Sequence, residues 1–98
     1  MRLSFHVHVE DDLIANALYY ERQCEGLGER FIGDYEQALA DIERFPLAWP
    51  MIHDDSGFRR RQLAHFPFGV YYRVLSGVLR ILALADLRRD QKPWLERE

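Results

Sequence analysis

The stretch that decides the fold is residues 68–85, FGVYYRVL-SG-VLRILALA. Two runs rich in β-branched and aromatic residues flank Ser76-Gly77, and this pattern predicts a β-hairpin with a two-residue turn. The second run, residues 78–85, is apolar except for Arg80. A nearly continuous apolar run is typical of a strand with neighbours on both sides, so we expect a central strand with one face against helices.

Two further strands are expected on either side of this hairpin in the sequence. Residues 59–63 precede it, and near the N-terminus apolar residues alternate with polar ones from Leu3 to Val9, the period of a half-buried strand. Because side chains alternate along a strand, Arg59 and Arg61 should share the solvent face while Arg60 points to the opposite face. An inward arginine would need a carboxylate partner.

The segment between these strands predicts an antiparallel helical hairpin. Asp11 and Asp12 open an apolar pattern of helical spacing that runs to about Glu25, and Gly26 and Gly28 are expected to reverse the chain through positive φ. Apolar residues then step by four and three along one face of a second helix, ended by Pro46: Phe31, Tyr35, Ala38, Ile42 and Phe45.

The expected order is therefore β, α, α, β, β, β, an α+β domain with the helices packed on a small twisted sheet. Residues 46–57 are expected to form a connecting loop that Trp49 and Met51 tether to the core. A chain of 98 residues with 48% apolar residues is expected to form one compact domain, residues 1–98.

Composition also restricts the class of protein. The single cysteine, Cys24, excludes an internal disulfide and a cysteine-based metal site, as is usual in a reducing compartment. The N-terminus lacks the apolar core of a signal peptide and no run is long enough to span a membrane, so we expect a cytoplasmic protein without a membrane partner. His6, His8, His53 and His65 have no recognised metal-site spacing, and we expect neither a metal nor a cofactor.

Charge is divided unevenly along the chain. Residues 1–58 hold 4 Arg and 12 Asp or Glu, a balance of −8, whereas residues 59–98 hold 9 Lys or Arg and 4 Asp or Glu, a balance of +5. This division predicts a dipolar molecule whose C-terminal half attracts a polyanion or an acidic protein segment. Alternatively, the acidic helices and the basic sheet neutralise one another's charge within the molecule.

Short motifs along nearly the whole chain carry a resemblance to a known family. They are Leu18-Tyr19-Tyr20-Glu21, Gly28-Glu29-Arg30-Phe31, Ile42 with Pro46, Arg60-Arg61-Gln62-Leu63, Phe66-Pro67, Val70-Tyr71-Tyr72-Arg73-Val74, Arg88-Arg89-Asp90, Trp94 and Arg97. In order and spacing the chain resembles the RelE/ParE superfamily of type II toxin–antitoxin toxins, also called plasmid stabilisation proteins. The fold that this resemblance implies agrees with the element order above.

The RelE-like branch of the superfamily implies one activity. Such members cut mRNA in the ribosome without a metal, using strand arginines, lysines and a C-terminal tyrosine. Here Gly69 stands where an arginine usually enters the third strand, and the second strand carries arginines in place of lysines. The C-terminal aromatic residue is Trp94, whose indole N–H does not ionise. If the chain is a nuclease, the catalytic candidates are Arg60 and Arg88.

ParE-like members resemble the sequence better. They bind DNA gyrase, stabilise its cleaved DNA complexes and catalyse no reaction themselves, and this activity is our leading expectation. The resemblance implies target-binding residues at Arg59, Arg61, Arg73, Arg88, Arg89 and Trp94. Asp86 replaces a histidine that many relatives place before the arginine pair, and we expect it to pair with Arg88 or Arg89. Arg88 and Arg89 could instead be an exposed cap on the sheet, and Trp94 a hydrophobic anchor for the C-terminus.

The resemblance also implies a partner, a cognate ParD-like antitoxin. A small sheet leaves an edge and an apolar groove for an added strand or an amphipathic helix, and an acidic tail suits the basic half of the chain. DNA would be contacted only through the toxin–antitoxin complex. Two alternatives to a gyrase toxin remain: a nuclease directed at the ribosome, and a non-toxic remnant that serves only as an antitoxin partner or co-repressor.

Overall fold

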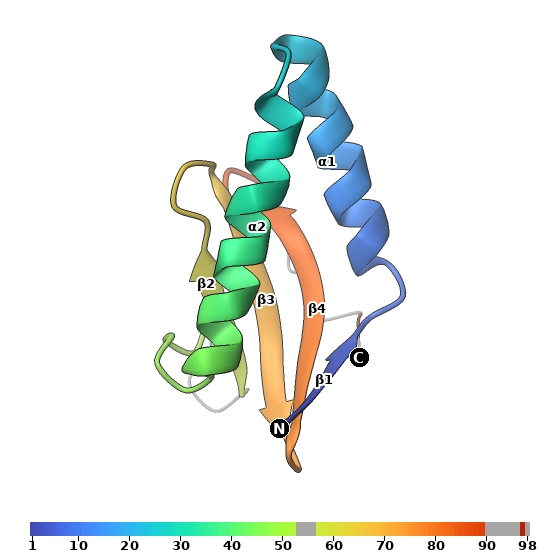
Figure 1. The fold of residues 1–98 in the computed structure, drawn as a ribbon. Coiled ribbons are helices and arrows are strands. Elements are labelled where there is room, and N and C mark those ends of the chain that lie inside the picture. The colour runs from blue at the N-terminus through green and yellow to red at the C-terminus, as the bar shows by residue number, and fades with distance from the viewer. Residues whose placement is uncertain (53–56, 90–96, 98) are drawn as a thin grey trace.

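A computed structural model describes residues 1–52, 57–89 and 97 of the chain. The elements follow the predicted order and form an α+β fold (Figure 1). Their bounds are β1 Arg2–Phe5, α1 Val9–Gln23, α2 Leu27–Arg44, β2 Phe58–Gln62, β3 Phe68–Leu75 and β4 Val78–Asp86. None of the helices in these residues has the length and apolar character needed to cross a membrane.

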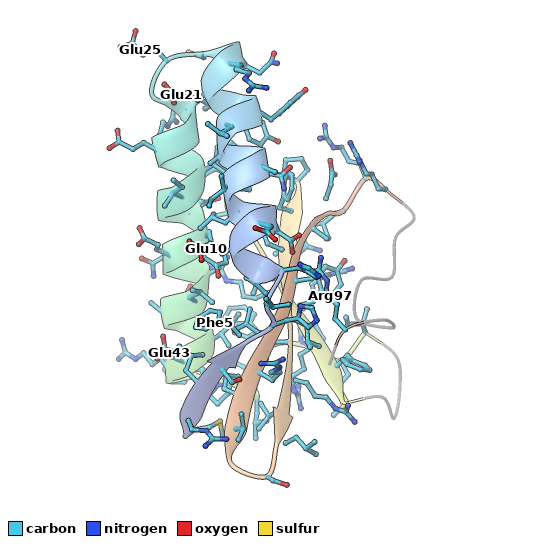
Figure 2. All side chains as sticks on the ribbon, turned by 90° about the vertical axis from the view of Figure 1, so that its right-hand side faces the viewer. Phe5, Glu10, Glu21, Glu25, Glu43 and Arg97 are labelled. Atoms are coloured by element: carbon cyan, nitrogen blue, oxygen red, sulfur yellow. The ribbon has the colours of Figure 1, made fainter. Side chains whose placement is uncertain are left out.

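The two helices form one layer of the fold. A four-stranded sheet, in the order β1-β4-β3-β2, forms the other layer. The strands β2, β3 and β4 are antiparallel to one another, and β1 pairs in parallel with β4 from Arg2 opposite Val78 to Phe5 opposite Ile81. The central position of β4 is thus confirmed. Both helices lie on one face of the sheet as an antiparallel pair, and the other face carries no helix of the described residues (Figures 1 and 2).

The turns of both hairpins depend on positive φ. Ser76 and Gly77 have φ of 51° and 76°, the combination that joins two strands through a two-residue turn, as predicted. Gly26 has a φ of 87° between the helices, which confirms its role in the chain reversal. The same role for Gly28 was wrong, because Gly28 lies inside α2, where that helix passes close to α1.

Periodicity placed Val9 in the wrong element and Phe45 in the wrong environment. The alternation from Leu3 to Val9 suggests one strand, but β1 ends at Phe5 and Val9 begins α1, where it is buried in the core. A helix beginning at Val9 places Glu10, Asp11 and Asp12 in its first turn, where the helix dipole favours acidic side chains. Phe45 is also exposed, because α2 ends at Arg44 and the backbone of Phe45 leaves the helical conformation.

The main core lies between the helices and the sheet. Its fully buried side chains come from both layers: Val9, Phe31, Ile42, Val70, Tyr72 and Ile81. The strand β4 contains a β-bulge. Tyr71 lies opposite Ala83 and Tyr72 lies opposite Ile81, so Leu82 is an extra residue between the two pairs. The bulge shifts the alternation by one residue, so that Ile81 and Leu84 both reach the core.

The opposite face of the sheet has its own apolar cluster, which we call the open-face cluster. Its buried members are Phe58, Tyr71, Leu82, Ala83 and Ala85. This second cluster explains why β4 is apolar on both faces although helices cover only one.

The segment after α2 is fastened to the sheet by polar contacts. The Tyr72 hydroxyl donates to the Pro46 carbonyl at 2.6 Å, and Trp49 packs against the main core, as predicted. Met51 instead forms an isolated backbone bridge opposite Arg59, and its side chain is exposed. The loop is thus held close to β2, beside the arginines of that strand.

Candidate functional site

Three consecutive arginines on β2 divide between the two faces of the sheet. Arg59 lies opposite Tyr72 and Arg61 opposite Val70, both core residues, so these arginines share the face that the helices cover. Arg60 points to the open face, where its guanidinium lies 5.9 Å from the centroid of the Tyr71 ring. The predicted alternation is confirmed, but the assignment of Arg59 and Arg61 to the solvent face was wrong.

Arg61 is bound between the sheet and α2. It donates to the Asp41 carboxylate and to the Gln62 carbonyl, and its guanidinium lies 5.2 Å from the Trp49 ring centroid. Its side chain is only 13% exposed, and the carboxylate partner expected for an inward arginine is present. The hydrogen bond from Arg61, followed by one from Gln37, lowers the pKa of Asp41 below its usual range.

Arg59 holds the segment that follows α2. Its guanidinium donates to the Trp49 carbonyl at 2.6 Å and lies 3.4 Å from the Leu47 carbonyl. Arg59 and Arg61 therefore fasten a loop and a helix to β2. In the isolated chain, both guanidinium groups donate to acceptors within the molecule.

Asp86, the last residue of β4, forms a tight pair with Arg88. One carboxylate oxygen accepts the Arg88 backbone N–H at 2.9 Å and its Nε at 3.0 Å, while the other accepts the second guanidinium nitrogen at 2.8 Å. The hydrogen bonds lower the pKa of Asp86 and raise that of Arg88. The predicted pairing is confirmed, and Arg88, whose side chain is 64% exposed, is held in one orientation.

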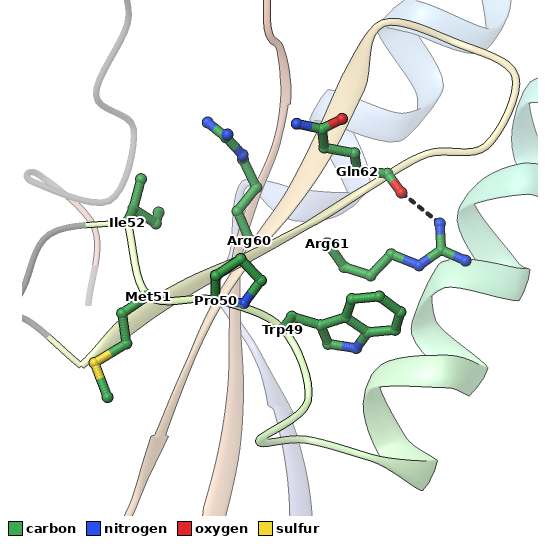
Figure 3. Close-up of a pocket in the computed structure, with 7 residues that line it drawn as sticks. All are labelled: Trp49, Pro50, Met51, Ile52, Arg60, Arg61 and Gln62. Atoms are coloured by element: carbon green, nitrogen blue, oxygen red, sulfur yellow. Dashed lines mark hydrogen bonds between the residues drawn. The ribbon is translucent and has the colours of Figure 1, made fainter.

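The stem of Arg60 crosses β3 at Gly69, which lies opposite Gln62 and diagonally from Arg60. A Cβ atom at Gly69 would lie 2.9 Å from both Cγ and Cδ of Arg60 and 3.1 Å from a methyl group of Leu87. The missing side chain thus leaves the space that the Arg60 stem occupies. A pocket of about 390 Å³ adjoins this position, lined by Trp49, Pro50, Met51, Ile52, Arg60, Arg61 and Gln62 (Figure 3).

The remaining target-binding candidates lie elsewhere. Arg73 is on the open face, with its guanidinium 4.9 Å from the Phe58 ring centroid, and Arg89 is exposed after β4. Trp94 lies outside the described residues, so both interpretations of it stay predictions. The described contacts do not bring the two nuclease candidates together: Arg60 contacts Tyr71 on the open face, whereas Arg88 is bound to Asp86.

Two polar clusters were not anticipated from the sequence. Arg97 donates to both carboxylate oxygens of Asp12, at 2.6 and 3.2 Å, and to the Leu82 carbonyl at 3.0 Å, while Asp12 also accepts the Leu84 N–H. These side chains bind backbone N–H and carbonyl groups at the edge of β4, beyond the point where β1 ends. Asp12 lies 72 residues from Leu84 and 85 residues from Arg97 in the chain, and no local pattern indicates such contacts.

The second unanticipated cluster holds the β2–β3 connection against α2. Asp34, which is buried, accepts the His65 backbone N–H at 2.8 Å and lies 3.0 Å from its ring Nδ1. Within residues 1–52, 57–89 and 97, no three His, Cys, Asp or Glu side chains are grouped as metal ligands would be. His53, one of the four histidines, lies outside the described residues.

The described side chains that meet around Arg59, Arg60, Arg61 and Arg88 are arginines, carboxylates and aromatic rings. Such groups can bind anions and protein surfaces, and a guanidinium can stabilise charge but is not a practical acid or base near neutral pH.

Comparison with solved structures supports the fold. The chain superimposes on a chain of a structure described as "Chromosomal ParDE TA system from P. aeruginosa". The TM-score is 0.66 with 18% identity, over 89% of this chain and 96% of that chain. This chain shares that fold. No protein-family model matches the sequence, and no curated protein matches it.

Proposed function

We propose that this chain is the toxin of a type II toxin–antitoxin pair, that it acts on DNA gyrase as ParE-like toxins do, and that a cognate antitoxin neutralises it in the cytoplasm. The observation that carries the proposal is the fold shared with a chain of the ParDE system across 96% of that chain's length. In that reading Arg88 and Arg89 face the target, since both are exposed at the end of β4.

The arrangement of the arginines supports an inhibitor over a nuclease. Arg59 and Arg61 are engaged in internal contacts, and Arg60 and Arg88 contact different partners. Gly69 stands at the start of the third strand, where RelE-like enzymes usually carry an arginine. Protein binding requires only exposed, oriented groups, such as the Arg88 guanidinium held by Asp86.

Controlled expression in a bacterial host tests the proposal. We expect growth arrest with filamentation, induction of the SOS response and intact mRNA, and we expect co-expression of the protein encoded beside this chain to restore growth. Arg88→Ala together with Arg89→Ala should relieve the arrest, whereas Arg30→Ala, at an exposed position on α2, should not. Cleaved messages without SOS induction, or normal growth at a confirmed level of folded protein, would contradict it.

A further inference from the structure

Tyr20 lies near the end of α1 and packs against the rim of the main core. Its ring centroid is 4.8 Å from that of Phe66, 5.3 Å from that of Phe31 and 6.1 Å from that of Phe68. The rings meet edge-to-face or tilted, as aromatic pairs prefer. Phenylalanines from α2, from β3 and from the segment before β3 therefore fix the position of the Tyr20 hydroxyl.

The Tyr20 hydroxyl lies within reach of Arg88, which follows the end of β4. Phe68, against which Tyr20 packs, is the register partner of Asp86, and Asp86 is the residue that holds Arg88. Burial raises the pKa of Tyr20, while the positive charge of Arg88 and a hydrogen bond from its guanidinium act in the opposite direction. The hydroxyl of a helix residue thus accepts a hydrogen bond from an arginine beyond β4.

Two anchors on different elements hold the Arg88 guanidinium. Asp86, at the end of β4, accepts its Nε and Nη2 at 3.0 and 2.8 Å, and Tyr20 on α1 accepts a further hydrogen bond. The Arg88 side chain is nevertheless 64% exposed, so the anchors fix its direction without burying it. Binding a partner costs less free energy when a long side chain is already held in its bound conformation.

Packing explains the ring of Tyr20 but not its hydroxyl. A phenylalanine would make the same ring contacts with its three phenylalanine neighbours, whereas the hydrogen bond with Arg88 needs the oxygen. Tyr72 shows the structural use of a tyrosine, since its hydroxyl donates to the Pro46 carbonyl and fastens a loop to the sheet. Tyr20 instead joins the helix layer to an exposed cation.

We propose that Tyr20 is a positioning residue for the action of this chain on its target. Its hydroxyl and the Asp86 carboxylate together hold the Arg88 guanidinium in the orientation in which it contacts the target. The inference rests on the proposed function, in which Arg88 faces gyrase. It also gives α1 a part in target binding, because Tyr20 reaches Arg88 from the helix layer.

Nuclear magnetic resonance of the full, isotope-labelled chain tests the positioning without any target. Arg88→Ala identifies the Arg88 Nε–H signal as the one that it removes, and Asp86→Asn shows the signal of a released guanidinium. We expect Tyr20→Phe to shift this signal towards the released position and to speed its exchange with water about twofold or more. Tyr19→Phe removes a hydroxyl from the neighbouring exposed ring and should leave the signal unchanged.

Cleavage of supercoiled plasmid by DNA gyrase in the presence of the chain then tests the effect on the target. Tyr20→Phe should raise the chain concentration for half-maximal linear DNA about three- to tenfold, with unchanged far-UV circular dichroism, and Tyr19→Phe should leave it within about twofold. An unchanged Arg88 signal in Tyr20→Phe, equal shifts in both variants, or full activity of Tyr20→Phe would overturn the inference. A wild-type chain without effect on gyrase would contradict the proposed function instead, and the Arg88 signal would then decide the positioning alone.

Discussion

At the scale of single residues, Gly28 allows the two helices to approach closely. A Cβ atom there would lie 2.6 Å from the Ala17 carbonyl oxygen, a backbone atom that cannot move aside cheaply, and 3.0 Å from Glu21. Glu21 also accepts the N–H groups of Gly26 and Gly28 and so caps the start of α2. The close approach and the cap together fix the angle at which α2 leaves the turn.

Substitution of two helical glycines should therefore have opposite effects. We expect Gly28→Ala to lower the free energy of unfolding by about 1–3 kcal/mol because it overpacks the helix contact. Gly33→Ala should raise it by about 0.5–1 kcal/mol, since a Cβ there meets nothing within 4 Å and alanine is the better helix former. Urea unfolding measures both, and equal effects of the two changes would contradict the close approach.

Two buried tyrosines should set the alkaline limit of stability. Burial raises the pKa of Tyr35 and of Tyr72 to about 12, above the value near 10 of an unfolded tyrosine. A raised folded-state pKa means that the contribution to stability is complete below about pH 10 and is lost as the pH rises through about 12. Absorbance of the phenolate, followed with circular dichroism, should show two tyrosines ionising only near pH 12 or on unfolding. Ionisation of all five near pH 10 in a folded chain would contradict this.

At the scale of elements, the edge of β4 is completed by side chains and not by a strand. Asp12 reaches it from the first turn of α1, and Arg97 reaches it from near the C-terminus. Both side chains are mostly buried, with about a fifth of each exposed. The pair therefore joins α1, β4 and the end of the chain.

Asp12→Asn tests this junction against a neighbouring aspartate. We expect it to lower the free energy of unfolding by about 1–3 kcal/mol because it removes the charge from hydrogen bonds to Arg97. Asp11→Asn makes the same change at the same end of α1, but Asp11 is exposed and lies 3.4 Å from His8, so its effect should stay below about 0.5 kcal/mol. Thermal unfolding of both variants gives the comparison. Similar losses of unfolding free energy in the two variants would mean that Asp12 acts through the helix dipole alone and not through its contact with Arg97.

The sequence predicted most of the elements for physical reasons that the structure confirms. The β3–β4 hairpin follows from its turn and flanking apolar runs, and the helical pair from the four-and-three spacing on α2. The end of β1 was missed because Val7 and Val9 continue its alternation, whereas a helix beginning at Val9 favours the acidic residues after it. The bulge at Leu82 could not be predicted, because an apolar run on both faces of a strand conceals a change of alternation.

The candidate site was less predictable than the fold. The sequence shows that Arg59 and Arg61 share a face but not which face, since this depends on whether the helices pack above or below the sheet. Their acceptors, Asp41 and the loop carbonyls, are 10 to 20 residues away in the chain. Only the Asp86–Arg88 pair is local enough for sequence proximity to suggest it.

At the scale of the whole molecule, charge is divided between the two layers. The helices α1 and α2 carry most of the acidic residues, and β2, β3 and β4 carry five arginines, Arg59, Arg60, Arg61, Arg73 and Arg80. Some of this charge is matched inside the molecule, as at Asp41 with Arg61 and Asp12 with Arg97. The internal match of charges thus holds in part, and the attraction of an acidic partner to the basic half stays a prediction.

The proposed action on gyrase is tested most directly with purified components. The chain would be incubated with DNA gyrase, ATP and supercoiled plasmid, and the DNA analysed after denaturation of the enzyme, with the Arg88→Ala, Arg89→Ala double variant as the matched control. We predict that the wild-type chain causes linear DNA to accumulate in covalent complexes with gyrase and that the double variant does not. Unchanged gyrase activity, together with cleavage of mRNA on translating ribosomes by the same preparation, would contradict the proposal.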